Sequence, residues 1–307
     1  MKILVTGGAG FIGSNVVDAF IEQGHDVVII DNMITGQQEN INPKATFYKM
    51  DIRDEKVIDV FEKEKFDIVN HHAAQMDVRK SVENPIYDAQ NNILGTINLM
   101  QAAVKHSVKK FIFISTGGAV YGEQDYFPAD EEHPTRPLSP YGITKLTGEK
   151  YLYFFSQTYG LNYVILRYAN IYGPRQSPHG EAGVVAIFTT KLLAGKKPII
   201  NGDGKQTRDY VFVGDVVNAN LKALTYEKND YFNIGTGIET DVNEIFHHLN
   251  ILTQSNVEEK HGPAKPGEQM RSVLNNSKAK KMFGWEPDVS LKDGLRQTVE
   301  FFKRKNK

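Results

Sequence analysis

The stretch that decides the fold is KILVTGGAGFIG at residues 2–13, where a short apolar run meets glycines spaced Gly-x-x-Gly-x-x-Gly. The apolar run predicts a buried strand, and the helical spacing of apolar residues over 11–23 predicts an amphipathic helix. Glycines between a strand and a helix allow a sharp turn and leave bare backbone where a phosphate can approach. Because the first N–H groups of a helix carry partial positive charge, this turn is a candidate phosphate-binding site.

Strand and helix patterns alternate through the first half of the chain. Further strands are predicted at 26–30, 46–50, 66–70, 110–115 and 162–166, and helices at 54–65, 91–106 and 142–159. Continuous apolar strands separated by helices are typical of a parallel sheet that is covered on both faces, with right-handed crossovers. We therefore predict an α/β fold with a doubly wound parallel sheet of the Rossmann type.

A carboxylate ends the second predicted strand. Asp31 can accept hydrogen bonds from the ribose hydroxyls of an adenosine and would repel a 2′-phosphate, so the turn and the acid together predict NAD rather than NADP. Asp51 and Ile52 follow the third strand, where they could hold the adenine edge. A helix N-cap region before Asp54 explains these two residues equally well.

The alternating pattern loosens after about residue 172. Gly and Pro punctuate 173–183, a helix is predicted near 184–194, a loop at 201–208 and a last helix near 291–305. We predict an NAD-binding Rossmann domain at 1–172, with segments from about 202–236 threading back to it. The rest, 173–307, would form a smaller C-terminal α/β substrate lobe.

Composition and charge narrow the function classes. The 307 residues carry a formal net charge of -1 and include no cysteine. Such a chain has no global field to attract nucleic acid or an anionic membrane, and it excludes disulfides and thiolate chemistry. Met1 leads directly into the first strand, and no apolar run reaches the ~18 residues of a membrane span. We expect a cytoplasmic protein with no metal site, no nucleic-acid partner and no membrane partner.

Tyr141 and Lys145 are four residues apart in a predicted helix, so they share one face. An ammonium and an oxidised nicotinamide stabilise a phenolate, so we expect a lowered pKa for Tyr141, which could then act as a general base. A core aromatic beside a solvated lysine is the alternative, and the NAD turn favours proton transfer. Ser115 and Thr116 end a strand, where ligands collect in a doubly wound sheet, although hydroxyls there can also cap an exposed strand end.

These motifs resemble the extended short-chain dehydrogenases/reductases and, within them, the UDP-glucose 4-epimerases. The resemblance covers essentially the whole chain. It rests on ILVTGGAGFIGSNVVD (3–18), DNMITG (31–36), HHAAQ (71–75), NNILGTINLM (91–100), STGGAVYG (115–122), SPYGITK (139–145), LRYANIYGPRQ (166–176), GDGKQTRDYVFVGDV (202–216), FNIGTG (232–237) and PGEQMRSVL (266–274). Together these stretches are specific for nucleotide-sugar enzymes and less specific for one substrate.

The resemblance implies two sets of binding residues. Those around NAD are Gly7, Gly10, Phe11, Ile12, Asp31, Asn32, Gly36, Asp51, Ile52, Ala73, Ala74, Gln75, Asn92, Ser115, Tyr141, Lys145 and Tyr168. Those around a UDP-sugar are Thr116, Gly117, Tyr141, Asn170, Arg208, Arg271 and Ser272. Asn170 would meet the diphosphate and the two arginines would clamp it, because a guanidinium fork suits phosphates. For Arg208 an ion pair with Asp209 or Asp203 is the alternative.

The chain departs from the family pattern at one strand end. The usual Ser-Ser-Ser-Ala-Thr-Val-Tyr-Gly reads STGGAVYG at 115–122, so the usual catalytic serine falls on Gly117. We therefore predict Thr116 as the third catalytic residue beside Tyr141 and Lys145. The Asp-Glu pair of nucleotide-sugar 4,6-dehydratases is replaced by glycines, which argues against elimination. Ser272 matches a position whose bulk limits N-acetyl groups, and a small serine leaves room for them.

The activity that the resemblance implies is NAD-dependent inversion of C4 of a UDP-hexose through a transient 4-keto sugar. UDP-glucose and UDP-galactose are the expected substrates, and their N-acetyl forms remain open. A homodimer would pair through the helices near 91–106 and 142–159, although burial inside one chain explains their apolar content equally well. The alternatives are a uronate epimerase, a decarboxylase, a 4-reductase, or a non-catalytic NAD-binding sensor. The proton-transfer set argues against a sensor.

Overall fold

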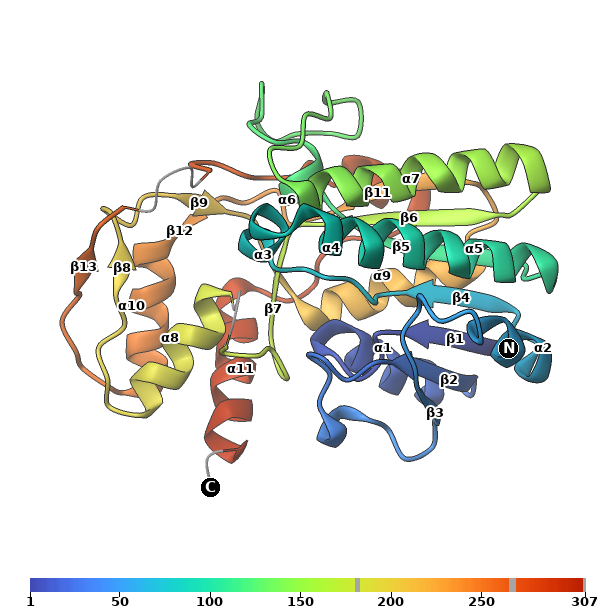
Figure 1. Cartoon of the computed structure of the whole chain (residues 1–307). Helices are drawn as coiled ribbons and strands as arrows, with labels where there is room; N and C mark the ends of the chain where they lie inside the picture. Colours follow the sequence, from blue (N-terminus) through green and yellow to red (C-terminus); the bar gives the residue numbers. More distant parts are fainter. Residues whose placement is uncertain (180–182, 265–268, 306–307) are drawn as a thin grey trace.

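The computed structural model describes residues 1–179, 183–264 and 269–305, and its centre is one sheet of seven parallel strands (Figure 1). The strand order is β11-β6-β5-β4-β1-β2-β3. The bounds are β1 Lys2–Thr6, β2 Asp26–Asp31, β3 Thr46–Lys49, β4 Ile68–His71, β5 Lys110–Thr116, β6 Tyr163–Tyr168 and β11 Asp230–Ile234. The predicted doubly wound parallel sheet is confirmed.

Helices cover both faces of the sheet, and this explains why its strands are apolar without alternation. Ile3 and Val5 of β1 lie in one buried cluster, while Leu4 between them lies in the cluster on the opposite face. The first cluster includes residues of α1 (Phe11–Glu22) and α9 (Val213–Thr225). The second includes residues of α2 (Val57–Glu64), α5 (Gly95–Lys105) and α7 (Pro140–Tyr159).

The strand order changes direction at β1, whose two neighbours are β4 and β2. In an open parallel sheet, ligands bind outside the carboxyl ends of the strands beside such a switch point. Three predicted site segments follow these ends: the Gly-rich turn after β1, residues 73–75 after β4, and Thr116 at the end of β5. The fold therefore gathers them at one edge.

A second group of elements has its own buried core. Figure 1 shows α8, α10 and α11 on the left of the view, beside the sheet and its helices. Phe188 of α8 and Phe246 of α10 meet edge to face at 6.3 Å between ring centroids. These elements are α8 Val184–Leu193, α10 Val242–Thr253, α11 Leu291–Lys305, and the strand pairs β7 Asn170–Tyr172 with β10 Tyr210–Phe212, β9 Thr207–Arg208 with β12 Thr240–Asp241, and β8 Ile200–Asn201 with β13 His261–Gly262. The proposed boundary at residue 172 stays a prediction.

The helix predicted at 91–106 is part of a longer, interrupted one. It begins with α4 (Pro85–Ala89), passes through a π-helical turn η2 (Gln90–Leu94) and continues as α5. The pattern of apolar residues did not reveal this interruption. Such turns are frequent at functional sites, and η2 carries the predicted cofactor residue Asn92.

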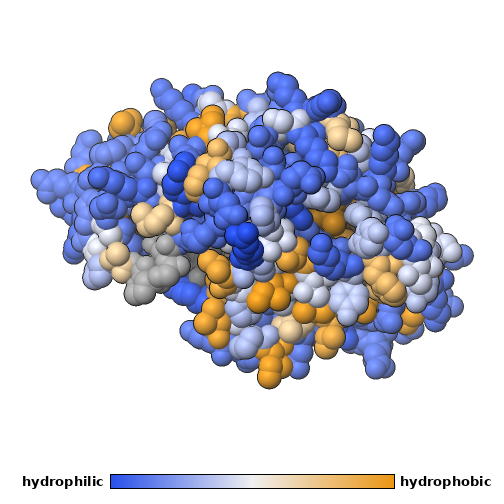
Figure 2. All heavy atoms as spheres, turned by 90° about the horizontal axis from the view of Figure 1, so that it is seen from above, coloured by the Kyte–Doolittle hydropathy of each residue, from blue (hydrophilic) through white to orange (hydrophobic). Residues whose placement is uncertain are grey.

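Apolar side chains reach the surface over α3 (Val78–Glu83), α4, η2 and α7, and Figure 2 shows them gathered in orange on the face seen from above. Ile86, Leu94 and Ile143 are 71%, 58% and 50% exposed. Contiguous exposed apolar surface of this kind marks an interaction site. Among the described residues, no helix is long and apolar enough to cross a membrane.

Candidate active site

The Gly-rich turn shapes a cradle at the start of α1. Gly7 has a φ of +69°, and a Cβ there would lie 2.7 Å from the backbone nitrogen of Ala73. A Cβ on Gly13 would collide with the carbonyl of Gly7, so only glycines allow this packing. The N-cap Gly10 offers no side-chain hydrogen bond to α1, which leaves the N–H groups at Phe11 and Ile12 to an outside acceptor. The turn fits a pyrophosphate.

Asp31 lies beside this turn as a buried carboxylate, 7% exposed. Its Oδ2 accepts a hydrogen bond from the backbone N–H of Ala9 at 3.0 Å, and its Oδ1 accepts one from Met33 at 2.8 Å. Gly36 packs directly on it, since a Cβ there would lie 2.8 Å from Asp31 Oδ1. A carboxylate fixed on two backbone amides keeps lone pairs for two neighbouring hydroxyls, so the geometry fits an adenosine ribose.

The residues predicted at the adenine edge are held by polar contacts. Asn32 Nδ2 donates to Asp51 Oδ2 at 3.0 Å. The backbone and guanidinium of Arg53 also donate to Asp51 and, with Asn32, hold its pKa down at about 2. Ile52 is buried against Gly95 of α5. The N-cap alternative for Asp51 is wrong, because α2 begins at Val57 with Lys56 as its N-cap.

After β4, the predicted cofactor residues Gln75 and Asn92 hydrogen-bond each other. The N–H of Gln75 donates to Asn92 Oδ1 at 2.8 Å, and Asn92 Nδ2 donates back to the Gln75 carbonyl at 2.9 Å. Ala73 donates its N–H to Thr6 Oγ1 at 3.2 Å. Ala74, between Ala73 and Gln75 in the chain, is half-buried. These contacts join the end of β4 to η2 and fix the loop that would line a cofactor.

Tyr141 and Lys145 lie in the first turns of α7, whose N-cap Ser139 accepts a hydrogen bond from Gly142. Lys145 is 5% exposed, and its Nζ donates to the carbonyl of Ile114 at 2.9 Å. Burial lowers the pKa of Lys145 to about 8, although the charges of Asp88 and Glu149 oppose this. The ammonium therefore titrates near physiological pH rather than near 10.

The prediction that the protein's own groups lower the pKa of Tyr141 is wrong. Burial raises the pKa of Tyr141 above its ordinary value, and the negative charge of Asp88 raises it further. Desolvation, which penalises the phenolate, is the larger of these two causes. Sequence spacing could place the pair on one face, but it could not show how deeply the phenol is buried.

At the end of β5 the hydroxyls of Ser115 and Thr116 face different surroundings. Ser115 Oγ donates to Glu149 Oε1 at 2.6 Å, so its side chain turns into the core rather than toward a ligand. Around Gly118, the side-chain oxygens of Thr116, Asn170 and Ser272 all lie within 3.8–3.9 Å of the point where a Cβ would stand. The fold thus brings together three predicted substrate residues, Thr116, Asn170 and Ser272, that are far apart in the sequence.

Gly117 has no room for the serine that the family usually places there. A Cβ on Gly117 would collide with Leu274 Cδ1, which fills the space above it. Leu274 is fully buried and is held in place because its N–H donates to the carboxylate of Asp209 at 3.2 Å. Leu274 therefore packs in the space that a serine side chain at position 117 would need.

The two predicted diphosphate arginines lie on adjacent segments. The N–H of Thr207 donates to the Met270 carbonyl at 2.9 Å, which places Arg208 beside Arg271 in the paired backbones. Arg208 Nη1 donates to the Thr207 carbonyl at 2.7 Å. Arg271 is exposed, pairs with Glu239 through Nε at 3.0 Å and Nη2 at 2.5 Å, and stacks on the ring of Phe127.

Tyr168 is a predicted site residue with a buried hydroxyl. It is 4% exposed, and its hydroxyl accepts a hydrogen bond from Asn220 Nδ2 at 2.6 Å. Burial raises its pKa above the ordinary tyrosine range. The side chain belongs to the core between β6 and α9. The hydroxyl is therefore bonded inside the core, and the place of Tyr168 beside the cofactor stays a prediction.

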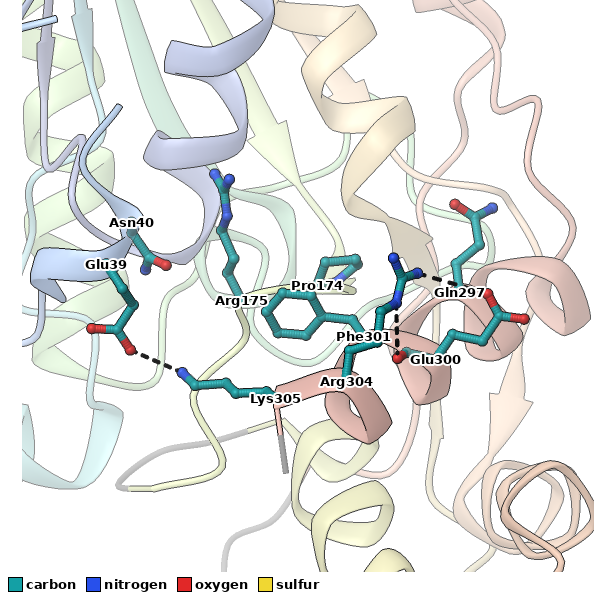
Figure 3. Close-up of a pocket in the computed structure, with 9 residues that line it drawn as sticks. All are labelled: Glu39, Asn40, Pro174, Arg175, Gln297, Glu300, Phe301, Arg304 and Lys305. Carbon is teal, nitrogen blue, oxygen red and sulfur yellow. Dashed lines mark hydrogen bonds and ion pairs between the residues drawn. The ribbon is translucent and has the colours of Figure 1, made fainter. Parts of the chain in front are cut away.

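A hollow of about 810 Å³ lies elsewhere, between the loop at Glu39 and α11 (Figure 3). None of the predicted site residues lines it. Lys305 and Glu39 form an ion pair at 3.0 Å across one side, and Arg304 bonds back to Glu300 of its own helix. These four charged groups therefore bind one another, while Arg175, which also lines the hollow, pairs with Asp18 at 2.6 Å. Among the described residues, no group of three His, Asp or Glu side chains could hold a metal ion.

Two buried acids near Lys145, Asp88 and Glu149, were not anticipated from the sequence. Asp88 accepts hydrogen bonds from Gln75, Asn92 and Thr144, and Glu149 pairs with Arg167 at 2.6 Å. The only sequence signal was spacing, since Asp88 and Asn92 are i,i+4 on one helix. Their burial depends on contacts across the fold.

A model of the NAD dependent epimerase/dehydratase family matches residues 3–235. This chain belongs to that family. A UDP-glucose 4-epimerase of Mycolicibacterium smegmatis is 42% identical over 312 aligned positions, covering 100% of both chains. The family membership that the motifs suggested is confirmed.

Solved structures of family members have the same architecture. A UDP-glucose 4-epimerase of Thermotoga maritima, solved with UDP-glucose, is 50% identical with a TM-score of 0.98 over 100% of both chains. A UDP-glucose 4-epimerase of Thermus thermophilus, solved with NAD, is 42% identical with a TM-score of 0.94 over 99% of both chains. Similarity of this extent covers the epimerase/dehydratase sheet and the second group of elements together.

Proposed function

We propose that this chain is an NAD-dependent UDP-glucose 4-epimerase that interconverts UDP-glucose and UDP-galactose. The observation that carries the proposal is the pairing of half-buried Tyr141 with buried Lys145 on α7, at the sheet edge where the Gly-rich cradle and Asp31 also lie, in a member of the epimerase/dehydratase family. Three features support this function: a site for NAD, a proton-transfer pair, and a neighbouring polar pocket.

NAD would be held by the residues that fit it. The N–H groups at Phe11 and Ile12 would bind the pyrophosphate, and Asp31 would bind the adenosine ribose. The remaining members of the predicted set would line the molecule along its length. When bound, NAD⁺ would accept a hydride from the sugar, return it to the opposite face, and place a positive charge beside the phenol.

Tyr141 would hold and release the proton of the sugar C4 hydroxyl. Lys145 supplies a buried positive charge on the same helix face, and a nearby cation favours the phenolate. Thr116, whose side chain lies in the polar group around Gly118, would share the substrate proton in place of the usual serine. Tyr141 and Thr116 would also position the 4-keto sugar while it turns.

The nucleotide must stay anchored while the sugar rotates. Asn170, Arg208 and Arg271 are the proposed diphosphate ligands, which requires Arg271 to exchange its contact with Glu239 for a phosphate. Ser272 is small, and its Oγ lies 3.8 Å from the point where a Cβ on Gly118 would stand, so we also propose that N-acetylated UDP-hexoses are accepted.

The rival functions differ in measurable ways. A 4-reductase would consume NADH, and a uronate epimerase or decarboxylase would need a carboxylated sugar. A sensor would bind NAD without turnover. The glycines at 117–118 leave out the acid pair that a 4,6-dehydratase uses for elimination. The similarity to UDP-glucose 4-epimerases, at 42% and 50% identity, favours epimerisation over these alternatives.

One assay tests the proposal. The purified protein is incubated with UDP-glucose, UDP-galactose and their N-acetyl analogues, without added NAD, and products are separated by chromatography. We expect interconversion within each pair. No interconversion of any of the four would overturn the proposal.

The first prediction concerns Tyr141. Tyr141→Phe removes only the hydroxyl, so turnover should fall at least ~1000-fold while NAD binding, measured by calorimetry, stays within about 2-fold. Ser156→Ala, on the far part of α7, serves as the control. Turnover surviving in Tyr141→Phe would contradict the assignment.

We also propose a cytoplasmic homodimer joined through the apolar surface over α3, α4, η2 and α7. Supporting this are the exposed apolar residues of Figure 2 and the position of those helices on one side of the molecule.

A further inference from the structure

Asp88 is a buried carboxylate close to the proton-transfer pair, and the proposed function gives it no task. It lies on α4 and is 0% exposed. Its Oδ1 accepts hydrogen bonds from Gln75 Nε2 at 2.9 Å and Asn92 Nδ2 at 3.1 Å, and its Oδ2 accepts one from Thr144 Oγ1 at 2.9 Å. Burying a carboxylate costs free energy unless such bonds replace water, so this arrangement is a built one.

The three donors come from three segments that each serve the site. Gln75 belongs to the loop after β4, Asn92 to the π-helical turn, and Thr144 to the first turns of α7. Thr144 Oγ1 also lies 3.0 Å from the carbonyl oxygen of Tyr141. Asp88 therefore joins the cofactor-lining loop to the helix that carries the tyrosine.

Lys145 is surrounded by few groups that carry charge. The negative charges of Glu149 on α7 and Asp88 on α4 act on Lys145, and its own charge acts on His71 and His72 at the end of β4. Tyr141 lies four residues before it on α7. Both histidines are neutral, because burial lowers the pKa of His72 to about 3 and that of His71 well below its ordinary value.

The two acids that face Lys145 are not equivalent. Glu149 is paired with the guanidinium of Arg167 at 2.6 Å, whereas the bonds to Asp88 come from neutral amide and hydroxyl groups. A cation beside Glu149 cancels much of its field at Lys145, while the field of Asp88 is left to act.

We propose that Asp88 is a positioning residue whose negative charge keeps Lys145 an ammonium and whose hydrogen bonds hold Gln75, Asn92 and Thr144 around Tyr141. The catalytic part of this inference rests on the proposed function, while the effect on Lys145 does not. Removing the charge lowers the pKa of Lys145 and of Tyr141 together, because the carboxylate now raises both.

The test is Asp88→Asn, with Thr144→Val as the matched control that removes one of the hydrogen bonds to Asp88 and keeps its charge. The first readout is a carbon-13 NMR titration of the lysine side chain, assigned as the signal missing in Lys145→Met, and it needs no substrate. We expect the Lys145 midpoint to fall by about one pH unit in Asp88→Asn and to stay near its original value in Thr144→Val.

The second readout is the pH profile of kcat/KM for UDP-galactose. Both limbs should move to lower pH in Asp88→Asn, and a purely structural role would lower the rate without moving them. An unchanged Lys145 midpoint in Asp88→Asn overturns the inference. If that variant does not fold, Asp88→Ser carries the same test. A wild-type protein without epimerase activity would overturn the proposed function and leave the NMR result to decide this one.

Discussion

Position 117 has no side chain, because Leu274, from near the end of the sequence, packs against Gly117. Gly117→Ser should destabilise the protein by about 1–3 kcal/mol, because its Cβ would collide with Leu274 in a filled core. Urea denaturation measures this. Gly118→Ala is the matched control, since its nearest neighbours are 3.8 Å away. Equal stability of both variants would mean that Leu274 can move aside.

We predict that Lys145 sets an upper pH limit for activity. Its pKa of about 8 means that the ammonium is lost as the pH rises through 8, and the phenolate of Tyr141 then loses its cation. We expect kcat/KM to fall above about pH 8. Circular dichroism over the same range controls for unfolding. A rate that stays constant up to the ordinary lysine pKa would contradict the assignment.

Among the elements, α7 is tied to β6 by a buried ion pair. Glu149 and Arg167 are 6% and 5% exposed and meet at 2.6 Å and 3.0 Å. Glu149→Gln should cost about 3–5 kcal/mol in the free energy of unfolding, because it leaves the guanidinium buried without its counter-charge. Denaturant titration measures this loss.

The control for that pair is an exposed one. Lys197 and Glu258 meet at 3.4 Å with side chains 49% and 91% exposed, so Glu258→Gln should cost less than about 1 kcal/mol. If both variants lost the same stability, burial would not be the reason that α7 stays on the sheet.

For the whole molecule, the apolar surface over α4, η2 and α7 should decide assembly. Leu94→Glu places a charge in that surface and should shift the protein from dimer to monomer, as measured by analytical ultracentrifugation. Ile251→Glu is the control, because Ile251 is 73% exposed but lies on α10, away from this surface. A monomeric wild-type protein would refute the proposed dimer.

The sequence by itself determined the sheet, the Gly-rich turn and the Tyr141–Lys145 spacing. Strand and helix periodicity is local, and so are the glycines that a sharp turn needs, so both can be seen along the chain. Family motifs then extended this to the proposed NAD and UDP-sugar residues. Thr116 as a substitute for the serine also followed from counting positions.

The tertiary structure alone decided what surrounds those residues. Burial raised the pKa of Tyr141 where spacing had suggested a lowering, and it turned Ser115 toward Glu149. Leu274 fills the space that a serine at position 117 would need, and Asp88 lies beside α7, the helix that carries Tyr141 and Lys145. Desolvation and packing depend on neighbours far away in the chain, so no local pattern records them.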